Sequence, residues 1–489
     1  MIRSCRGRVS AVFAAALQML IGGCAINPAT GTVDFMLVST EEEAEIGRKT
    51  HPQVLAEFGG VYYDPALATY VEQVGNRIVA ITELQDFEYR FTVLDSPTVN
   101  AFAVSGGYVY VTRGLLALLS SEAELAGVLS HELAHINARH GAQRLSGMKA
   151  EDRLCAAFGC DFEVPVLGDT AAVGIRLAFG GFSQDQELEA DELGLRYLTA
   201  AGYDSRGMTD FLRKLEAQRD LDARVAGLGA PRKDSHGYAS THPLTGARIE
   251  QVAGLIEGAG RSGGMLGVTV YLNAIDGLLY GNRQEYGFVI GRTYAHPIRR
   301  VTFTVPPGYA MYADSHRVTA LGPDGAAILF EPSRRLITGS VTEYLTNIWA
   351  EGLPLADVRG FQINGLDAAT GWLRSEDQQH PMDYRLVAVR AGTGTIYRFL
   401  FLVPAQSSAH ASEDLRKATY SFRTLDEDEA ASLRPRRVRI ITAAQGDTLE
   451  SIVPLNKFAD HARERFSILN GLGPAAALEP GQPVKLVRY

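Results

Sequence analysis

The sequence has 489 residues, 46% of them hydrophobic and 21% charged, which is enough for two or three globular domains. Its formal net charge is -9, and the first 23 residues carry three arginines and no acid, so the chain from Cys24 onward is more acidic still. This balance argues against nucleic acid as a partner.

The first 23 residues have the pattern of a targeting segment. Three arginines precede the apolar run at residues 9–21, which is too short and too interrupted for a comfortable membrane span. The next residues, Ile-Gly-Gly-Cys ending at Cys24, resemble a bacterial lipobox, whose cysteine becomes the acylated first residue of the mature protein. We predict a lipoprotein signal peptide over 1–23 and a lipidated tether over 24–40. An ordinary cleaved signal and an uncleaved anchor are the alternatives.

The residues that follow indicate a compartment. By resemblance to lipoprotein sorting signals, Ala25 after the cysteine favours the outer membrane. We therefore expect a periplasmic body held to that membrane by lipid, because no later stretch reaches the ~18 apolar residues of a transmembrane helix. With Cys24 acylated, Cys155 and Cys160 form an even pair that can close a small disulfide loop in an oxidising compartment.

Two helices and two strands are expected before the main motif. They are helices at residues 41–58 and 64–81 and strands at residues 89–94 and 108–112. The second strand closely precedes the motif helix. We expect it to lie along a cleft and offer a free edge to an extended peptide, unless it is paired on both sides.

The most informative stretch is HELAH, which runs from His131 to His135. Ser121 and Glu124 form a capping box ahead of it, and the apolar residues keep helical spacing, so the motif lies within a helix. Since four residues make about one turn, both histidines project from one face and can share a metal ion. Glu132 lies about 100° round the helix, placed to take a proton from an activated water, as in HExxH zinc peptidases. The alternative is two solvated histidines that match by chance.

A third ligand is expected from a second helix, which begins at the capping box of Ser183 and Gln186 and ends at Gly202. Glu187 and Asp191 share its inward face. A zinc ion held by two histidines is a sufficient partner for a buried Glu187, and Asp191 can accept the free N–H of a ligating histidine. Ordinary buried salt bridges are the alternative. The opposite face, expected to be solvated, carries Glu189, Glu192 and Arg196.

HELAH, the ExxAD pattern that begins at Glu187 and the later AGYD together resemble the HtpX and CAAX-prenyl-protease family of zinc metallopeptidases, of the gluzincin type. The resemblance also includes NAFAVSGGYVYVTRGLL before the motif and the THP around His242 with Arg248 after it. It covers residues 41–257. The soluble periplasmic branch, the BepA-like lipoproteins, is more similar than the branch with transmembrane helices.

The resemblance implies a zinc ion, one per chain, bound by His131, His135 and Glu187, with Glu132 as the general base. His242 precedes a proline, and most such histidines pack a loop. In relatives this segment lies near the cleft, where His242 can steady the oxyanion or occupy the fourth position of zinc. We expect His140 and His236 to be surface histidines, the remaining histidines having no ligand spacing.

Two further regions follow. Residues 265–430 are expected to form a mixed α/β domain of short strands, with a hairpin turn at 322–325 and helices at 340–351 and 412–420. This region contains no chemical motif and is interpreted as a substrate-binding or interaction domain. Residues 437–489 are expected to form a small βααβ unit that resembles LysM, the peptidoglycan-binding module. A structural cap of LysM type is the alternative.

The sequence therefore predicts an α+β protein. A mainly helical zincin-type metalloprotease domain with a small sheet, at residues 41–258, precedes the domains at 265–430 and 437–489. We expect a zinc metalloendopeptidase of the bacterial envelope that cleaves unfolded or misassembled envelope proteins. A peptidoglycan-directed zinc peptidase and a non-enzymatic assembly factor with a latched zinc site are the alternatives.

Overall fold

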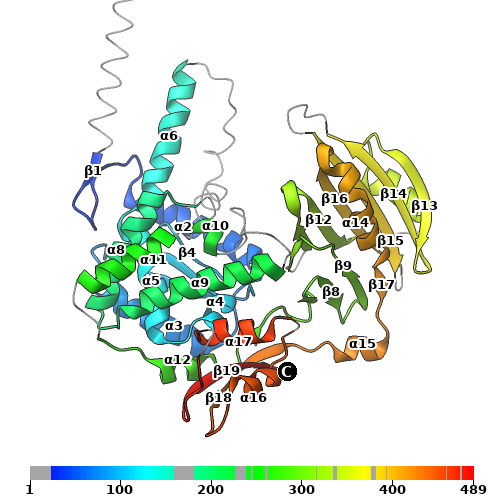
Figure 1. Ribbon diagram of the computed structural model, residues 1–489. Helices are drawn as coiled ribbons and strands as arrows, with labels where there is room; N and C mark the ends of the chain where they lie inside the picture. The colour runs from blue at the N-terminus through cyan, green and yellow to red at the C-terminus, as the bar shows by residue number, and fades with distance from the viewer. Residues whose placement is uncertain are drawn as a thin grey trace, which may run out of the picture. The chain divides into compact units, whose positions relative to one another are not determined.

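The computed structural model describes residues 24–158, 181–225, 238–243, 246–258, 263–314, 317–333, 339–375, 381–391, 394–458, 460–473 and 476–489 (Figure 1). The predicted signal peptide, His236 and Cys160 lie outside these residues, so the disulfide stays a prediction. The chain divides into two compact units. The first contains residues 1–216, 233–275 and 469–471, and the second contains 217–232, 276–468 and 472–489. Within the described part of the chain, no helix combines the length and the apolar character needed to cross a membrane.

The first unit is mainly helical. Its helices are α2 (Thr40–Glu57), α3 (Pro65–Val79), α4 (Arg113–Leu118), α5 (Glu122–Asn137), α6 (His140–Phe158), α8 (Gln184–Ala200), α10 (Tyr238–Thr241), α11 (Gly246–Gly258) and α12 (Val268–Ile275), and α9 (Arg206–Val225) begins in it. The HELAH motif lies in α5, which packs against α3, α8, α12 and β4 (Ala101–Val104). All 16 residues of α5 are buried, so this helix is the centre of the unit (Figure 1).

The strand order of the small sheet in this unit corrects the prediction of a free edge at residues 108–112. Its strand order is β3 (Arg90–Leu94), β5 (Tyr108–Thr112), β4, with β5 parallel to β3 and antiparallel to β4. The strand expected to offer a free edge, β5, is therefore central and paired on both sides. Its five buried residues suit a central position, because both faces of the strand are covered. The strand next to α5 that pairs on only one side, among the described residues, is β4.

Local capping explains where the two main helices begin. The Ser121 side chain accepts the Glu124 N–H at the start of α5, but the Glu124 carboxylate accepts the Ser120 N–H and the Lys214 ammonium rather than closing a capping box. At the start of α8 both bonds of the predicted capping box are present, between Ser183 and Gln186. Gly202 follows α8 with a φ of +85°, the left-handed conformation that ends helices.

The second unit is β-rich, and its sheets are antiparallel. The largest has seven strands in the order β10, β11, β12, β16, β15, β14, β13. Their bounds are Ala310–Ala313, Val318–Leu321, Ala327–Pro332, Thr395–Pro404, Met382–Ala391, Leu366–Arg374 and Ala356–Ile363. The predicted turn joins β11 to β12, with positive φ at Asp324 and Gly325. Two long strands, β13 and β14, lie where the sequence predicted no element.

Smaller elements complete this unit. The second sheet has the order β17 (Arg423–Thr424), β9 (Val301–Thr304), β8 (Thr293–His296), β7 (Phe288–Ile290), and the third has the order β19 (Pro483–Arg488), β18 (Arg436–Thr442), β6 (Leu279–Tyr280). The helices are α13 (Val341–Tyr344) with a π-helix at Leu345–Trp349, α14 (Ser408–Tyr420), α15 (Glu427–Ser432), α16 (Leu449–Ile452) and α17 (Ala462–Asn470). The C-terminal elements follow the predicted βααβ order. Their LysM resemblance stays a prediction.

Candidate metal centre

Helices α5 and α8 approach closely at Gly194, and this contact determines how near the two parts of the site lie. A Cβ atom at position 194 would lie 3.1 Å from the Cα and N atoms of His131, so a larger residue would push the helices apart. Glu187 and Asp191, on the same side of α8, are both buried. The contact therefore brings two carboxylates to the histidines of α5.

Four buried side chains meet between these helices. They are His131, His135, Glu187 and His242, and one ligand atom of each lies within 4.8 Å of the others. The two Nε2 atoms of α5 are 3.1 Å apart, and the Glu187 oxygens lie 3.5 and 3.6 Å from them. A tetrahedral ion with ligands at about 2.0–2.1 Å has its ligand atoms about 3.3 Å apart. The donor atoms present therefore fit a small metal ion.

Both histidines turn Nε2 inward, and each Nδ1 lies close to a polar side chain on the outer side. His131 Nδ1 lies 2.9 Å from Asp191 Oδ1, and His135 Nδ1 lies 2.8 Å from His140 Nδ1. Such contacts hold the tautomer and the ring orientation of a ligating histidine. Asp191 thus lies beside one of the two histidines.

Arg248, from α11, joins the two carboxylates of α8. Its Nε and Nη2 atoms donate to the two Asp191 oxygens at 2.7 and 2.8 Å, and its Nη1 lies 2.7 Å from Glu187 Oε2. The side chain is fully buried, so this ion pair compensates charge that would otherwise be costly. The sequence predicts no role for Arg248, because a residue 57 positions from Asp191 carries no local signal of the contact.

The prediction that His140 lies on the surface is wrong. His140 is fully buried, and its Nε2 lies 2.9 Å from Glu189 Oε2, which extends the chain of contacts outward from His135. The chain turns between α5 and α6 at Arg139, which has a φ of +53°, and this turn brings His140 back beside His135. Glu189, placed by spacing on the solvated face, is only partly exposed. Helical periodicity could not reveal this contact because the helix ends between the two histidines.

Glu132 is a buried carboxylate without hydrogen-bond donors. Neither of its oxygens has a hydrogen-bond partner among the described residues, and His242 Nε2 lies 3.4 Å from Oε1. Burial raises the pKa of this carboxyl above its ordinary value. A carboxylate in this state is a competent proton acceptor for a water between it and the metal position.

The charges of the ligand side chains differ sharply. Burial disfavours a protonated His131, but its contacts with Asp191 and Glu187 outweigh burial and raise its pKa to about 9. Burial, followed by the nearby charge of His131, holds the pKa of His135 well below its ordinary value. Burial also opposes ionisation of Glu187, yet His242, His131 and Arg248 hold its pKa well below the ordinary range. A metal ion entering here meets a carboxylate, a neutral imidazole and an imidazole that must release its proton.

His242 belongs to the ligand group. It follows α10, where its N–H bonds to the Tyr238 carbonyl at 2.8 Å and its ring stacks on Tyr238 at 4.5 Å between centroids. Its Nδ1 lies 3.0 Å from Glu187 Oε1 and 3.3 Å from His131 Nε2. His242 therefore packs against Tyr238 of α10 and also lies beside two of the other side chains of the ligand group.

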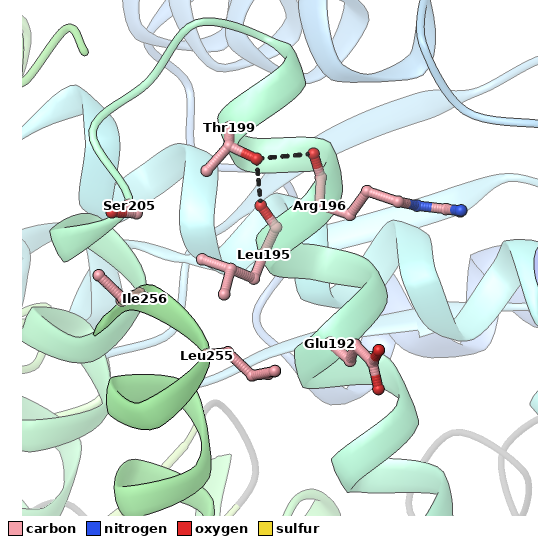
Figure 2. A pocket seen from close by; sticks show the side chains of 7 residues that line it. All are labelled: Glu192, Leu195, Arg196, Thr199, Ser205, Leu255 and Ile256. Carbon is pink, nitrogen blue, oxygen red and sulfur yellow. Dashed lines mark hydrogen bonds between the residues drawn. The ribbon is translucent and has the colours of Figure 1, made fainter. Parts of the chain in front are cut away.

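A separate pocket is lined by residues of α8, of α11 and of the segment after α8 (Figure 2). Its lining consists of Glu192, Leu195, Arg196, Thr199, Ser205, Leu255 and Ile256. The Thr199 hydroxyl donates to the Leu195 and Arg196 carbonyls, and the Arg196 guanidinium pairs with Glu83. No histidine and neither of the buried α8 carboxylates lines this pocket, so it is distinct from the metal centre.

A metal position between two histidines one turn apart and a carboxylate of a second helix, with a free carboxylate beside it, is the defining arrangement of an HExxH metallopeptidase. The chain therefore contains a metallopeptidase domain. Residues 65–256 match the model of Peptidase family M48, so this part of the chain is a peptidase M48 domain.

Two similar proteins carry names of proteases, which agrees with the match to Peptidase family M48. Mitochondrial metalloendopeptidase OMA1 of Schizosaccharomyces pombe is 30% identical over 224 residues, which cover 45% of this chain and 62% of the relative. Beta-barrel assembly-enhancing protease of Yersinia pestis is 30% identical over 234 residues, or 45% of each chain. The match to LpqN of Mycobacterium tuberculosis, a solved structure, covers 26% of this chain and 83% of LpqN at 10% identity, and its TM-score of 0.22 is too low for any inference. The matches to OMA1 and to the beta-barrel assembly-enhancing protease thus cover less than two thirds of the length of either relative.

Proposed function

We propose that this protein is a zinc-dependent metalloendopeptidase of the bacterial cell envelope, which cleaves misfolded or stalled envelope proteins. One observation carries the proposal. The ligand atoms of the buried residues His131, His135 and Glu187 lie 3.1 to 3.6 Å apart, and the same helix pair carries Glu132, whose carboxylate receives no hydrogen bond among the described residues. Two imidazoles and one carboxylate are one of the donor sets that catalytic zinc sites use.

In this proposal His131, His135 and Glu187 hold the zinc ion. Held by these residues, zinc would supply Lewis-acid chemistry: it would polarise the scissile carbonyl and make water a stronger nucleophile at neutral pH. Glu132 accepts the proton of the attacking water and passes it to the leaving amine. Asp191 and His140 hold the two imidazoles in the Nε2-ligating orientation.

His242 is proposed to close the fourth ligand position in the resting protein. Its Nδ1 lies as near to Glu187 and His131 as those residues lie to each other, so it occupies space that a substrate carbonyl needs. Movement of the short segment that carries it would open the position, and the same ring, displaced slightly, would stand beside the oxyanion. These two roles predict opposite effects of its removal.

The peptide substrate is proposed to add to the edge of β4. Among the described residues β4 has β5 as its only strand partner, and it packs against α5, which carries the metal ligands. The Tyr238 N–H already bonds to the Val99 carbonyl just before β4, at 2.9 Å, so this edge accepts main-chain hydrogen bonds. An extended, unfolded segment is the substrate form that such an edge can bind.

The envelope location is proposed from the lipobox that ends at Cys24 and from relatives named beta-barrel assembly-enhancing protease. The βααβ order of the C-terminal elements favours a second candidate, a peptidoglycan-directed zinc peptidase. A resting site closed by His242 favours a third, an assembly factor that does not cleave.

One experiment separates these candidates. The purified protein is incubated with an unfolded polypeptide and, in parallel, with cross-linked peptidoglycan, and released termini are quantified by mass spectrometry. We expect new termini in the polypeptide and none in the peptidoglycan. Cleavage of peptidoglycan alone would replace the proposal by the second candidate, and cleavage of neither substrate by wild type or by His242→Ala would favour the third.

A further inference from the structure

The chain that follows Cys24 forms a two-stranded hairpin with one apolar face. Strands β1 (Cys24–Ile26) and β2 (Val33–Phe35) are antiparallel, with Ile26 opposite Val33 and the Cys24 position opposite Phe35. Directly opposite residues, and residues two apart on one strand, share a face of a ribbon. Ile26 is 70% exposed, Val33 69% and Phe35 38%. These three side chains are called the apolar hairpin face.

The other face of the hairpin is fixed to the peptidase domain. Asn27 is buried, and its Nδ2 donates to the Ala138 carbonyl at 3.1 Å and to Asp34 Oδ2 at 2.8 Å. Gln143 of α6 donates to the same Asp34 oxygen at 2.8 Å. Just after β2, Met36 and Val38 pack into a small core with Ile46, Ala142 and Leu145. The apolar hairpin face is therefore held rigidly on the side away from α6.

The position of this face in the chain indicates what covers it. The hairpin begins at the residue that the lipobox pattern would acylate, and the 23 residues before it lead to that point. Three exposed apolar side chains cover far less than the about 800 Å² per partner that a stable protein interface buries. A bilayer needs no such minimum area, because apolar side chains next to an acyl anchor enter its interface one by one.

We propose that the apolar hairpin face lies on a phospholipid bilayer and holds the peptidase domain at a set orientation on the membrane. The inference rests on the proposed acylation of Cys24. Acyl chains alone would leave the domain free to rotate, whereas the face adds a second contact that is rigid relative to α5 and α6. Asn27 bonds to Ala138, three residues after His135, so the metal centre is kept close above the membrane surface. Polypeptides emerging from or stalled at that surface are the substrates that reach it.

The test places a tryptophan on each face of the hairpin. Val33→Trp reports on the apolar hairpin face, and Thr32→Trp, at the exposed neighbouring position on the other face, is the matched control. Each full-length acylated protein is reconstituted into vesicles of phosphatidylethanolamine and phosphatidylglycerol, with and without brominated acyl chains. The emission of the wild type, which has two tryptophans, is subtracted. Flotation in the same samples measures membrane attachment.

We expect both variants to float, Val33→Trp to lose most of its added emission to brominated lipid, and Thr32→Trp to keep its emission and remain open to aqueous acrylamide. Equal quenching in the two variants, with both floating, would overturn the inference while leaving the peptidase and its tether standing. Acrylamide protection of Val33→Trp without lipid would overturn it in favour of a second protein copy on this face. Proteins that do not float would overturn both the tether and the inference. Both positions are exposed, and an unchanged thermal unfolding midpoint verifies that the variants fold.

Discussion

His140 Nδ1 lies 2.8 Å from His135 Nδ1, although the two residues belong to different helices. One ring must donate and the other accept. If His135 offers its Nε2 lone pair to a metal, its Nδ1 carries the proton and donates to His140, whose Nε2 then donates to Glu189 at 2.9 Å. In the metal-bound protein, each hydrogen bond in the series from His135 through His140 to Glu189 therefore has one donor and one acceptor.

The first prediction concerns this series of hydrogen bonds. His140→Phe removes the acceptor for His135 Nδ1, so zinc affinity should fall about 10–100-fold, as for other partners of ligating histidines. Competition with a fluorescent chelator measures the affinity. Glu189→Gln retains a carbonyl oxygen that accepts from His140 and should lose less. An unchanged affinity in His140→Phe would show that the contact does not orient His135.

The second prediction concerns the carboxylate ligand. Glu187→Ala leaves two histidines for the metal, so the purified variant should hold well under one zinc per chain, measured by elemental analysis. Glu192→Ala is the control, because Glu192 lies on the exposed side of the same helix. If Glu187→Ala retains stoichiometric zinc, the ligand assignment is wrong.

The third prediction concerns pH. The pKa of His131 is raised from 6.5 to about 9 in the folded, metal-free chain, so its protonated form stabilises the fold. This contribution is fully present below pH 6.5 and is lost as pH rises through about 9. The thermal unfolding midpoint of chelator-treated protein should therefore fall across this range, and it should fall less in Asp191→Asn. In zinc-loaded protein, where His131 is already deprotonated, the midpoint should lack this fall. The same slope in chelated and loaded protein would contradict the assignment.

The fourth prediction concerns His242. If it closes the fourth ligand position, His242→Ala should cleave an unfolded polypeptide faster than wild type while retaining zinc through the other three ligands. Slower cleavage with retained zinc would instead assign His242 to oxyanion stabilisation. Initial rates at equal zinc content distinguish the two roles.

Several parts of the site could be predicted from the sequence because they depend on neighbours in the chain. The helical spacing around HELAH predicts that His131 and His135 share a face, and the structure places their Nε2 atoms 3.1 Å apart. The start of α8 follows from Ser183 and Gln186 alone. Glu187 was inferred from the inward face of that helix, and its carboxylate lies in the ligand group.

Other parts depend on contacts that no local pattern encodes. The central position of β5 results from its parallel pairing with β3, and strand order cannot be deduced from the alternation of one strand. His140 was misplaced because the turn at Arg139 interrupts the helical period between it and His135. Arg248 reaches Asp191 from a different helix. Strand β13 was missed because it is largely exposed and lacks a clear apolar alternation.

The central claim is that this chain hydrolyses peptide bonds with Glu132 as the base, and Glu132→Gln tests it most directly. The change leaves His131, His135 and Glu187 intact, so the variant should keep one zinc per chain while its cleavage of an unfolded polypeptide falls by a factor on the order of 10² or more. Glu192→Gln, an exposed change on α8, should match wild type in both measurements. If zinc-loaded Glu132→Gln digests the polypeptide as fast as wild type, the protein is not the peptidase described above.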